Sequence, residues 1–156
     1  MRSQKGFSLI ELLLVVAVIL IIAAIAIPNF MRARMTANES SAVASLRNID
    51  TAQVSFASSN PLQGFASDLN TLGPANASLL DNILGCPAGV GTASCEKSGY
   101  TFNITAGAGV PLNTYSANGN PSTPGTTGNR YFYTDNGDLI RYNTTAVANA
   151  DDLEIQ

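Results

Sequence analysis

GFSLIELLLVVAVILIIAAIAIP, residues 6–28, is the stretch of this 156-residue sequence that decides the architecture of its N-terminal part. From residue 12 to residue 27 it contains no polar side chain, and residues 7–27 read as one helix are about 30 Å long at about 1.5 Å per residue. A helix of that length crosses a lipid bilayer. One carboxylate, Glu11, lies almost at the start of the apolar run, where lipid penalises its charge unless a partner neutralises it.

A cut after Gly6 would create the missing partner. The new α-amino group of Phe7 would lie one helical turn before Glu11, in an (i, i+4) relation and at the positive end of the helix dipole. Cleavage behind the short basic leader, residues 1–6, would therefore supply the countercharge that Glu11 lacks.

These features together resemble the precursor of a type IV pilin, in which a basic leader ending in glycine precedes a Phe-Ser-Leu-Ile-Glu start and a proline closes the apolar run. In that family a membrane prepilin peptidase cleaves after the glycine and N-methylates the new terminal phenylalanine. The resemblance covers roughly residues 5–57. It implies cleavage after Gly6, methylation of Phe7 and pairing of Glu11 with the amino terminus of a neighbouring subunit. It also implies a bend at Pro28 that stretches during assembly.

The resemblance implies a structural protein, not an enzyme, that needs no cofactor. Its precursor would be held in the bacterial inner membrane, processed by prepilin peptidase, and polymerised with copies of itself by the inner-membrane assembly machinery. The product would be a surface filament, the pilus or fimbrium, that serves adhesion, motility or DNA uptake. The major pseudopilin of a type II secretion system shares the leader and helix but forms a periplasmic pseudopilus. Length and start motif do not separate the two.

Three readings outside this family stay open. The basic leader and the small residues at 24–26 are also compatible with a secretory signal peptide, although Glu11 interrupts the start of the apolar run. A plain signal anchor explains the length of the run but not its carboxylate. A secreted or membrane-anchored β-rich binding module is the rival from another class. The charges do not fix the orientation of the apolar helix in the membrane, because Arg32 and Arg34 on one side balance the basic residues of the leader on the other.

Composition places the remainder of the chain in one extracytoplasmic domain. The sequence is 46% hydrophobic and only 12% charged, and Gly, Asn, Ser, Thr and Ala are abundant. We expect a leader at residues 1–6, a membrane and filament-core helix at 7–30, and a globular domain at 31–156. Without the leader, six basic residues stand against eleven acidic ones, which argues against nucleic-acid binding by the single subunit.

Cys86 and Cys95 are the only cysteines, and in an exported chain they are most simply a disulfide that closes a loop of about ten residues. Metal ligation is disfavoured, because the sequence has no histidine and two thiolates make only half of a tetrahedral site. Many type IV pilins close a larger loop at the C-terminus with their cysteines. This pair lies in mid-chain, so the resemblance does not extend to that loop.

Beyond Pro28 the pattern predicts an amphipathic continuation of the helix to near Ser58. Uncharged side chains recur every three to four residues along one stripe, whereas charged ones, including Glu39 and Asp50, lie mostly off it. The stripe consists of Val43, Leu46, Ile49, Gln53 and Phe56. Pro28 should kink or locally unwind the helix, because a proline within a helix loses one hydrogen bond and clashes with the preceding turn. The alternative is that Pro28 ends the membrane helix.

The expected fold class is α+β, with the long N-terminal helix packed on a small antiparallel sheet. Alternating apolar and polar residues predict a strand at 100–105. Residues 131–134 and 139–142 flank an Asn-Gly pair, which predicts a hairpin with a two-residue turn and Tyr133 opposite Ile140. In that register Tyr131 lies opposite Tyr142, and Tyr131 and Tyr133 belong to the apolar face that covers the helix stripe.

The other segments carry weaker patterns. Glycine, asparagine, proline, serine and threonine dominate residues 107–129, which predicts a long exposed loop with one strand near 113–116. Residues 64–95 read as loop with a short helix across 78–84. Asp151, Asp152 and Glu154 predict an exposed acidic tail.

No catalytic constellation is visible in the sequence. Without histidine there is no Ser-His or Cys-His nucleophile, and no phosphate-cradling glycine motif is present. Asp135 and Asp138 lack the alternating oxygen ligands of a dedicated calcium loop, so we read them as solvated turn residues and predict no metal site.

Overall fold

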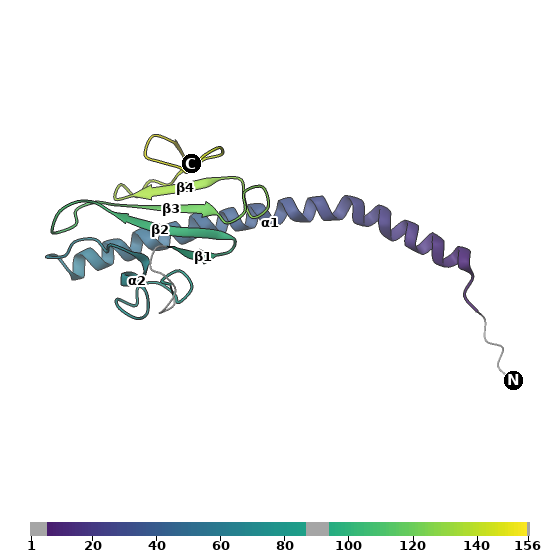
Figure 1. The fold of residues 1–156 in the computed structure, drawn as a ribbon, viewed down its shortest axis with the longest axis horizontal. Coiled ribbons are helices and arrows are strands. Elements are labelled where there is room, and N and C mark those ends of the chain that lie inside the picture. Colours follow the sequence, from purple (N-terminus) through teal and green to yellow (C-terminus); the bar gives the residue numbers. More distant parts are fainter. Residues whose placement is uncertain (1–5, 87–93, 156) are drawn as a thin grey trace. The chain divides into compact units, whose positions relative to one another are not determined.

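The computed structural model describes residues 6–86 and 94–155, which form one long helix, one short helix and six strands. The helices are α1 (Leu9–Ser59) and α2 (Leu69–Leu72). The strands are β1 (Cys95–Lys97), β2 (Tyr100–Ala106), β3 (Tyr115–Pro121), β4 (Tyr131–Asp135), β5 (Arg141–Asn143) and β6 (Leu153–Glu154). The predicted α+β fold is confirmed (Figure 1).

Two compact units divide the chain, Met1–Arg34 and Met35–Gln156. We call the second unit the head. Helix α1 contributes residues 9–34 to the first unit and residues 35–59 to the head. Helix α1 continues through Pro28 without a break. The alternative that Pro28 ends a membrane helix is therefore wrong.

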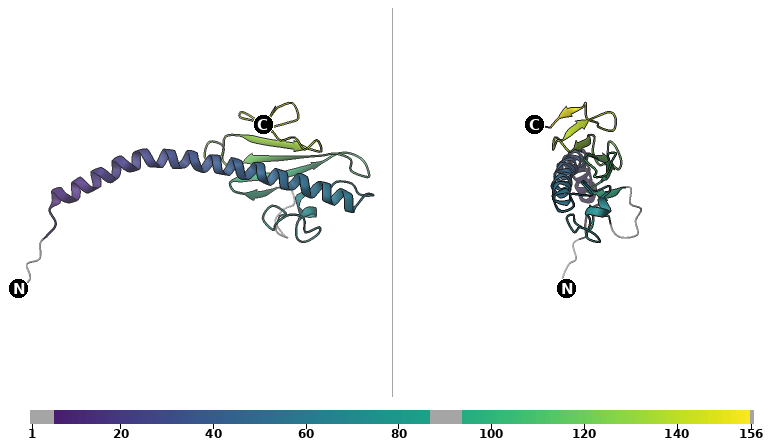
Figure 2. Two further views of the ribbon diagram at one scale, coloured as in Figure 1. Left: turned by 180° about the vertical axis from the view of Figure 1, so that it is seen from behind. Right: turned by 90° about the vertical axis from the view of Figure 1, so that its left-hand side faces the viewer.

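The sheet of the head is an antiparallel meander in the order β1-β2-β3-β4-β5-β6. Strand β3 pairs with β2 along its whole length, from Tyr100↔Pro121 to Ala106↔Tyr115, and pairs on its other side with β4. Figure 2 shows residues 35–59 of α1 crossing one face of this sheet. A single face is therefore covered by the helix, which explains why buried residues alternate with partly buried ones along β3, β4 and the first half of β2.

The hydrophobic core lies between the helix and the covered face of the sheet. Leu46 and Ile49 are completely buried and Phe56 nearly so, which confirms the predicted stripe at these positions. The side chains that meet them from the sheet are Tyr100, Phe102, Ala117 and Phe132. Leu69 and Leu72 of α2 belong to the same core.

The predicted hairpin exists, but its register is wrong by one residue. Tyr133 pairs with Arg141 instead of Ile140. The connection is not a two-residue turn but the longer loop 136–140, in which Asp138 adopts a left-handed backbone conformation with φ 58°. This longer loop shifts the partner strand by one position.

The side chains of β4 that face the helix also differ from the prediction. Phe132 and Thr134 are fully buried, whereas Tyr131 and Tyr133 are only half-buried. Because side chains alternate along a strand, a slip of one residue moves the whole set to the other face. The predicted apolar face built on the two tyrosines is therefore wrong.

The predicted loop at 107–129 is interrupted by a longer strand than expected, because β3 covers Tyr115–Pro121 where the prediction placed a strand near 113–116. Gly119 of β3 packs so closely on Phe102 that an added Cβ would lie 3.0 Å from a ring carbon. The small residues that imitate a loop in the sequence are required by this close packing.

Two smaller predictions of secondary structure are also wrong. Residues 78–84 form no helix, because the Asp81 carboxylate accepts the N–H groups of Ile83 (3.0 Å) and Leu84 (2.7 Å) in a single turn, and the helix lies earlier, at α2. The C-terminal acidic residues are not a plain tail, because Leu153–Glu154 forms β6 against β5.

Candidate functional site

The start of the apolar helix is the first candidate site. Gly6, Phe7 and Ser8 precede α1, and the carbonyl oxygen of Ser8 accepts the N–H groups of Glu11 and Leu12, both at 3.2 Å. Phe7 is 79% exposed. The residue pattern that predicts a cleavage site thus lies in an exposed, non-helical segment joined to the first helical turn.

Glu11 is the acidic residue of that first turn, and its side chain is exposed. Among residues 6–86 and 94–155, no cation forms an ion pair with it. No side chain between residues 9 and 34 is buried. By length and composition α1 is able to cross a membrane, and its most apolar window is entirely unburied. The carboxylate and the apolar surface both lack a partner within the described chain.

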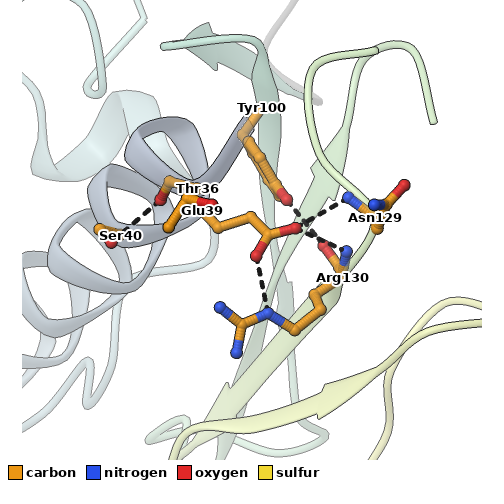
Figure 3. Close-up of polar contacts among 6 residues, drawn as sticks. All are labelled: Thr36, Glu39, Ser40, Tyr100, Asn129 and Arg130. Carbon is orange, nitrogen blue, oxygen red and sulfur yellow. Dashed lines mark hydrogen bonds and ion pairs between the residues drawn. The ribbon is translucent and has the colours of Figure 1, made fainter. Parts of the chain in front are cut away.

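The second candidate site lies in the head, where Glu39 of α1 meets the segment that leads into β4 (Figure 3). The Glu39 Oε1 atom accepts the backbone N–H groups of Asn129 at 2.9 Å and Arg130 at 3.3 Å, and its Oε2 atom accepts the Arg130 Nε–H at 2.8 Å. Glu39 is 8% exposed. One buried carboxylate therefore fixes three donors that lie about ninety residues later in the sequence.

Arg130 is held by further contacts. Its guanidinium carbon lies 5.5 Å from the ring centroids of both Phe132 and Tyr142, within range of a cation–π interaction. Tyr100 donates its hydroxyl to the Arg130 carbonyl oxygen at 2.8 Å. Burial and the nearby charge of Glu39 raise the pKa of Tyr100, so its hydroxyl stays a donor. This cluster joins α1, β2 and β4.

A second buried carboxylate, Asp50, lies further along α1. Its Oδ1 atom accepts the Tyr115 hydroxyl at 2.8 Å, and its Oδ2 atom accepts the Thr134 hydroxyl at 2.9 Å. Asp50 is 4% exposed, and no cation pairs with it among the described residues. Burial raises its pKa to about 6, the two hydrogen bonds oppose that rise, and the charges of Asp138 and Asp135 add to it. This carboxylate fastens α1 to β3 and β4.

Glu39 and Asp50 were predicted off the buried stripe, and this prediction is wrong. Glu39 stands three residues before the buried Ala42 and seven before Leu46, so helical periodicity does place it on the stripe. This spacing from Ala42 and Leu46 is the feature of the sequence that identifies Glu39 as buried. Asp50 follows Ile49 directly, and only the hydroxyl donors supplied by the sheet explain its burial.

The predicted disulfide between Cys86 and Cys95 is present. It ties the segment after α2 to β1 at the edge of the sheet. Gln53 fastens the same part of the head, because its amide exchanges two hydrogen bonds with the backbone of Ala66, at 2.8 and 3.0 Å. Within the described ranges, no three histidine, cysteine or acidic side chains gather as metal ligands. Glu39 and Asp50 therefore have a structural role, because their hydrogen bonds hold helix α1 against the sheet.

Comparison with known proteins agrees with the N-terminal pattern. Residues 1–27 match the family model for the prokaryotic N-terminal methylation motif. The chain is 36% identical over 109 residues to the type IV major pilin protein PilA of Myxococcus xanthus, an alignment that covers 69% of this chain and 47% of that protein. It is 52% identical over 48 residues to the type IV wide pilus major component PilA4 of Thermus thermophilus, covering 31% of this chain and 37% of that protein.

The chain spans less than half the length of both curated relatives. No solved structure matches it significantly. The head nevertheless has the helix-on-sheet architecture that the N-terminal motif led us to expect. The methylation motif, the pilin-like fold and the similarity to the two relatives together support a type IV pilin.

Proposed function

We propose that the chain is the structural subunit of a type IV pilus, polymerised through its N-terminal helix into a surface filament for adhesion, motility or DNA uptake. The observation that carries the proposal is Glu11, an exposed carboxylate in the first turn of an apolar helix, without an ion-pair partner in the described chain. The names of both relatives, which are pilus components, support a filament subunit and a structural role.

The proposed sequence of events begins in the bacterial inner membrane. Residues 7–30 hold the precursor in lipid while the globular domain, residues 31–156, lies outside the cytoplasm. Prepilin peptidase cleaves after Gly6 and methylates the amino group of Phe7. That amino group then provides the cation for Glu11 of a neighbouring copy. Pairing removes the cost of a lone charge among apolar helices and fixes the register of neighbouring subunits.

The apolar helix supplies the remaining free energy of assembly. Leaving the bilayer is offset when residues 12–27 pack against the same segment of other copies, aided by the inner-membrane assembly machinery. Pro28 lacks the backbone N–H that an ordinary residue donates at its position, so the helix is easier to bend there. We propose that this bend adjusts as the subunit enters the filament.

The direct test is the N-terminus and intact mass of the protein from the cell envelope and from sheared surface material. A chain that begins at methylated Phe7 in the sheared fraction supports the pilin. The same processed chain confined to the envelope favours the major pseudopilin of a type II secretion system. A chain that begins near Ile27, or that still begins at Met1, contradicts the proposal and favours a secreted or anchored β-rich binding module.

Substitution at Glu11 tests the pairing mechanism. Glu11→Leu and Glu11→Gln remove the charge, and we expect normal membrane insertion but loss of sheared filaments. Glu11→Asp keeps the charge and should retain part of the assembly. Glu154→Gln is the matched control, because Glu154 is an exposed carboxylate of the head. Wild-type filament yield from Glu11→Leu cells would contradict the mechanism while leaving the N-terminal processing intact.

A further inference from the structure

The sequence contains two Asn-Gly pairs, Asn118-Gly119 and Asn136-Gly137, and the structure places them in opposite environments. An Asn-Gly pair is chemically reactive, because the glycine lacks a side chain that would hinder attack of its backbone nitrogen on the asparagine side-chain carbonyl. The attack needs a local backbone that is free to rearrange. Whether each pair reacts is therefore decided by its place in the fold.

Asn118-Gly119 lies in the middle of β3, which is paired on both sides. Asn118 is opposite Asn103 of β2 and Tyr133 of β4, and Gly119 is buried. The Asn118 side-chain amide donates to the carbonyl oxygen of Ala148 at 2.9 Å. Formation of a cyclic imide at Asn118 requires β3 to separate from its neighbouring strands. Its rate is therefore limited by local unfolding of this central strand.

Asn136-Gly137 lies in the loop between β4 and β5, and both residues are exposed. The Gly137 N–H has no strand partner but donates to the Asp135 Oδ1 atom at 2.8 Å. A carboxylate at this distance is able to take the proton that the nitrogen loses as it attacks. No ladder hydrogen bond has to break.

We propose that Asn136 is a site of spontaneous deamidation in the folded protein and that Asn118 is protected. The Gly137 nitrogen attacks the Asn136 side-chain carbonyl carbon, a C–N bond forms, and the side-chain nitrogen leaves as ammonia with the proton. Water then opens the cyclic imide at one of its two carbonyls, which leaves aspartate or isoaspartate. The net reaction consumes one water and releases one ammonia, so no oxidant or cofactor is involved.

The product adds a negative charge where carboxylates already gather. Asn136 lines a cavity of about 300 Å³ together with Asp50, Asp138 and Tyr115. A third carboxylate there repels the buried charge of Asp50, which fastens α1 to β3 and β4. Deamidation therefore weakens the attachment of the helix to the sheet as the protein ages.

Peptide mapping by mass spectrometry of the full chain, incubated folded at mildly alkaline pH, tests the proposal. We expect the peptide that holds residue 136 to gain about one dalton, and the two product isomers to separate on chromatography. The peptide that holds residue 118 should convert at least about a thousandfold more slowly, because it waits for unfolding of the central strand. The chain in denaturant is the internal control, in which both pairs should convert at similar rates.

Two outcomes would overturn the proposal: equal rates at the two positions in the folded protein, or no conversion at 136 while the denatured chain converts. Asn136→Gln keeps an amide but must close a larger ring, so its mass gain should be lost.

Asn136→Asp carries the product charge, and its thermal midpoint at neutral pH should fall below that of Asn136→Gln. Equal midpoints for these two variants would show that the charge does not weaken the head. Neither result depends on filament assembly, because both are read on the folded chain.

Discussion

At the scale of single residues, two buried carboxylates of α1 bind the helix to distant segments of the head. Glu39 fixes the segment before β4 and Asp50 fixes β3 and β4 themselves. They differ in their countercharge, because Arg130 pairs with Glu39 whereas no cation pairs with Asp50 among the described residues. A buried charge without a cation makes stability depend on pH.

Asp50 should make the head more stable at mildly acidic pH. Its folded-state pKa of about 6 exceeds the ordinary value of 3.8, so the folded chain binds a proton that the unfolded chain has already lost. This contribution is complete below the ordinary pKa and is lost as the pH rises through 6. We expect Asp50→Asn to gain stability relative to wild type at neutral pH, by about 3 kcal/mol at most.

The measurement is denaturant unfolding of both proteins between about pH 5 and pH 7. The wild type should lose stability relative to Asp50→Asn as the pH rises, since asparagine does not titrate. A difference between the two that stays constant across this range would show that Asp50 titrates normally in the fold.

Glu39 should be costly to remove. Glu39→Ala leaves the two backbone N–H groups and the guanidinium of Arg130 without their acceptor, and we expect a loss of about 2 kcal/mol in the free energy of unfolding. Arg130 is partly exposed, so water limits the loss. Glu96→Ala, which removes an exposed carboxylate bonded only to Ser122 in the described contacts, is the control and should cost under about 0.5 kcal/mol. Equal losses in the two variants would refute the role given to Glu39.

At the scale of elements, β3 shows how packing overrides composition. Its sequence is rich in small and polar residues, yet it is the strand that β2 and β4 both pair with. A Cβ added at Gly119 would lie 3.0 Å from a ring carbon of Phe102, so that ring would have to shift to admit a side chain, and Leu46 of α1 would lie 3.7 Å from the same Cβ. The glycine creates the room in which helix and sheet meet.

Gly119→Val should therefore destabilise the head. The branched side chain has no space between Phe102 and Leu46, and overpacking of this kind costs about 2 kcal/mol or more. Thr105→Val, at an exposed position of β2, is the control and should stay within about 0.5 kcal/mol of wild type. Thermal unfolding followed by near-ultraviolet circular dichroism measures both. A Gly119→Val protein as stable as wild type would mean that the sheet relaxes to admit the side chain.

At the scale of the whole molecule, the two units differ in burial as well as in contacts. Residues 9–34 bury no side chain, whereas the head has its own core, disulfide and polar fastenings. A unit that contains its own core is able to fold by itself. The apolar unit instead needs lipid or other copies to cover it.

The fragment 35–156 should accordingly be a soluble monomer that unfolds in one cooperative transition. The full chain should need detergent or filament packing to stay in solution, because the apolar side chains of residues 9–27 are exposed. Size-exclusion chromatography and denaturant unfolding of the fragment check this. A fragment that aggregates, or that lacks a cooperative transition, would show that residues 9–34 contribute to the fold of the head.

The sequence by itself determined the long helix, its apolar first part, the stripe at Leu46, Ile49 and Phe56, and the pairing of the two cysteines. These features follow from hydrophobic periodicity and from cysteine count, which are local properties of the chain. The resemblance to type IV pilins, too, was readable from the N-terminal motif. None of these inferences required knowledge of which strands are neighbours.

Only the tertiary structure decided the burial of Glu39 and Asp50, the register of β4 with β5, and the strand character of β3. Each depends on a partner far away in the sequence: the donors at residues 129 and 130, the hydroxyl groups of Tyr115 and Thr134, and the ring of Phe102. A buried carboxylate, a shifted register and a glycine-containing central strand are unfavourable when judged locally. They are stable here because distant residues supply the hydrogen bonds and the close packing that offset their cost.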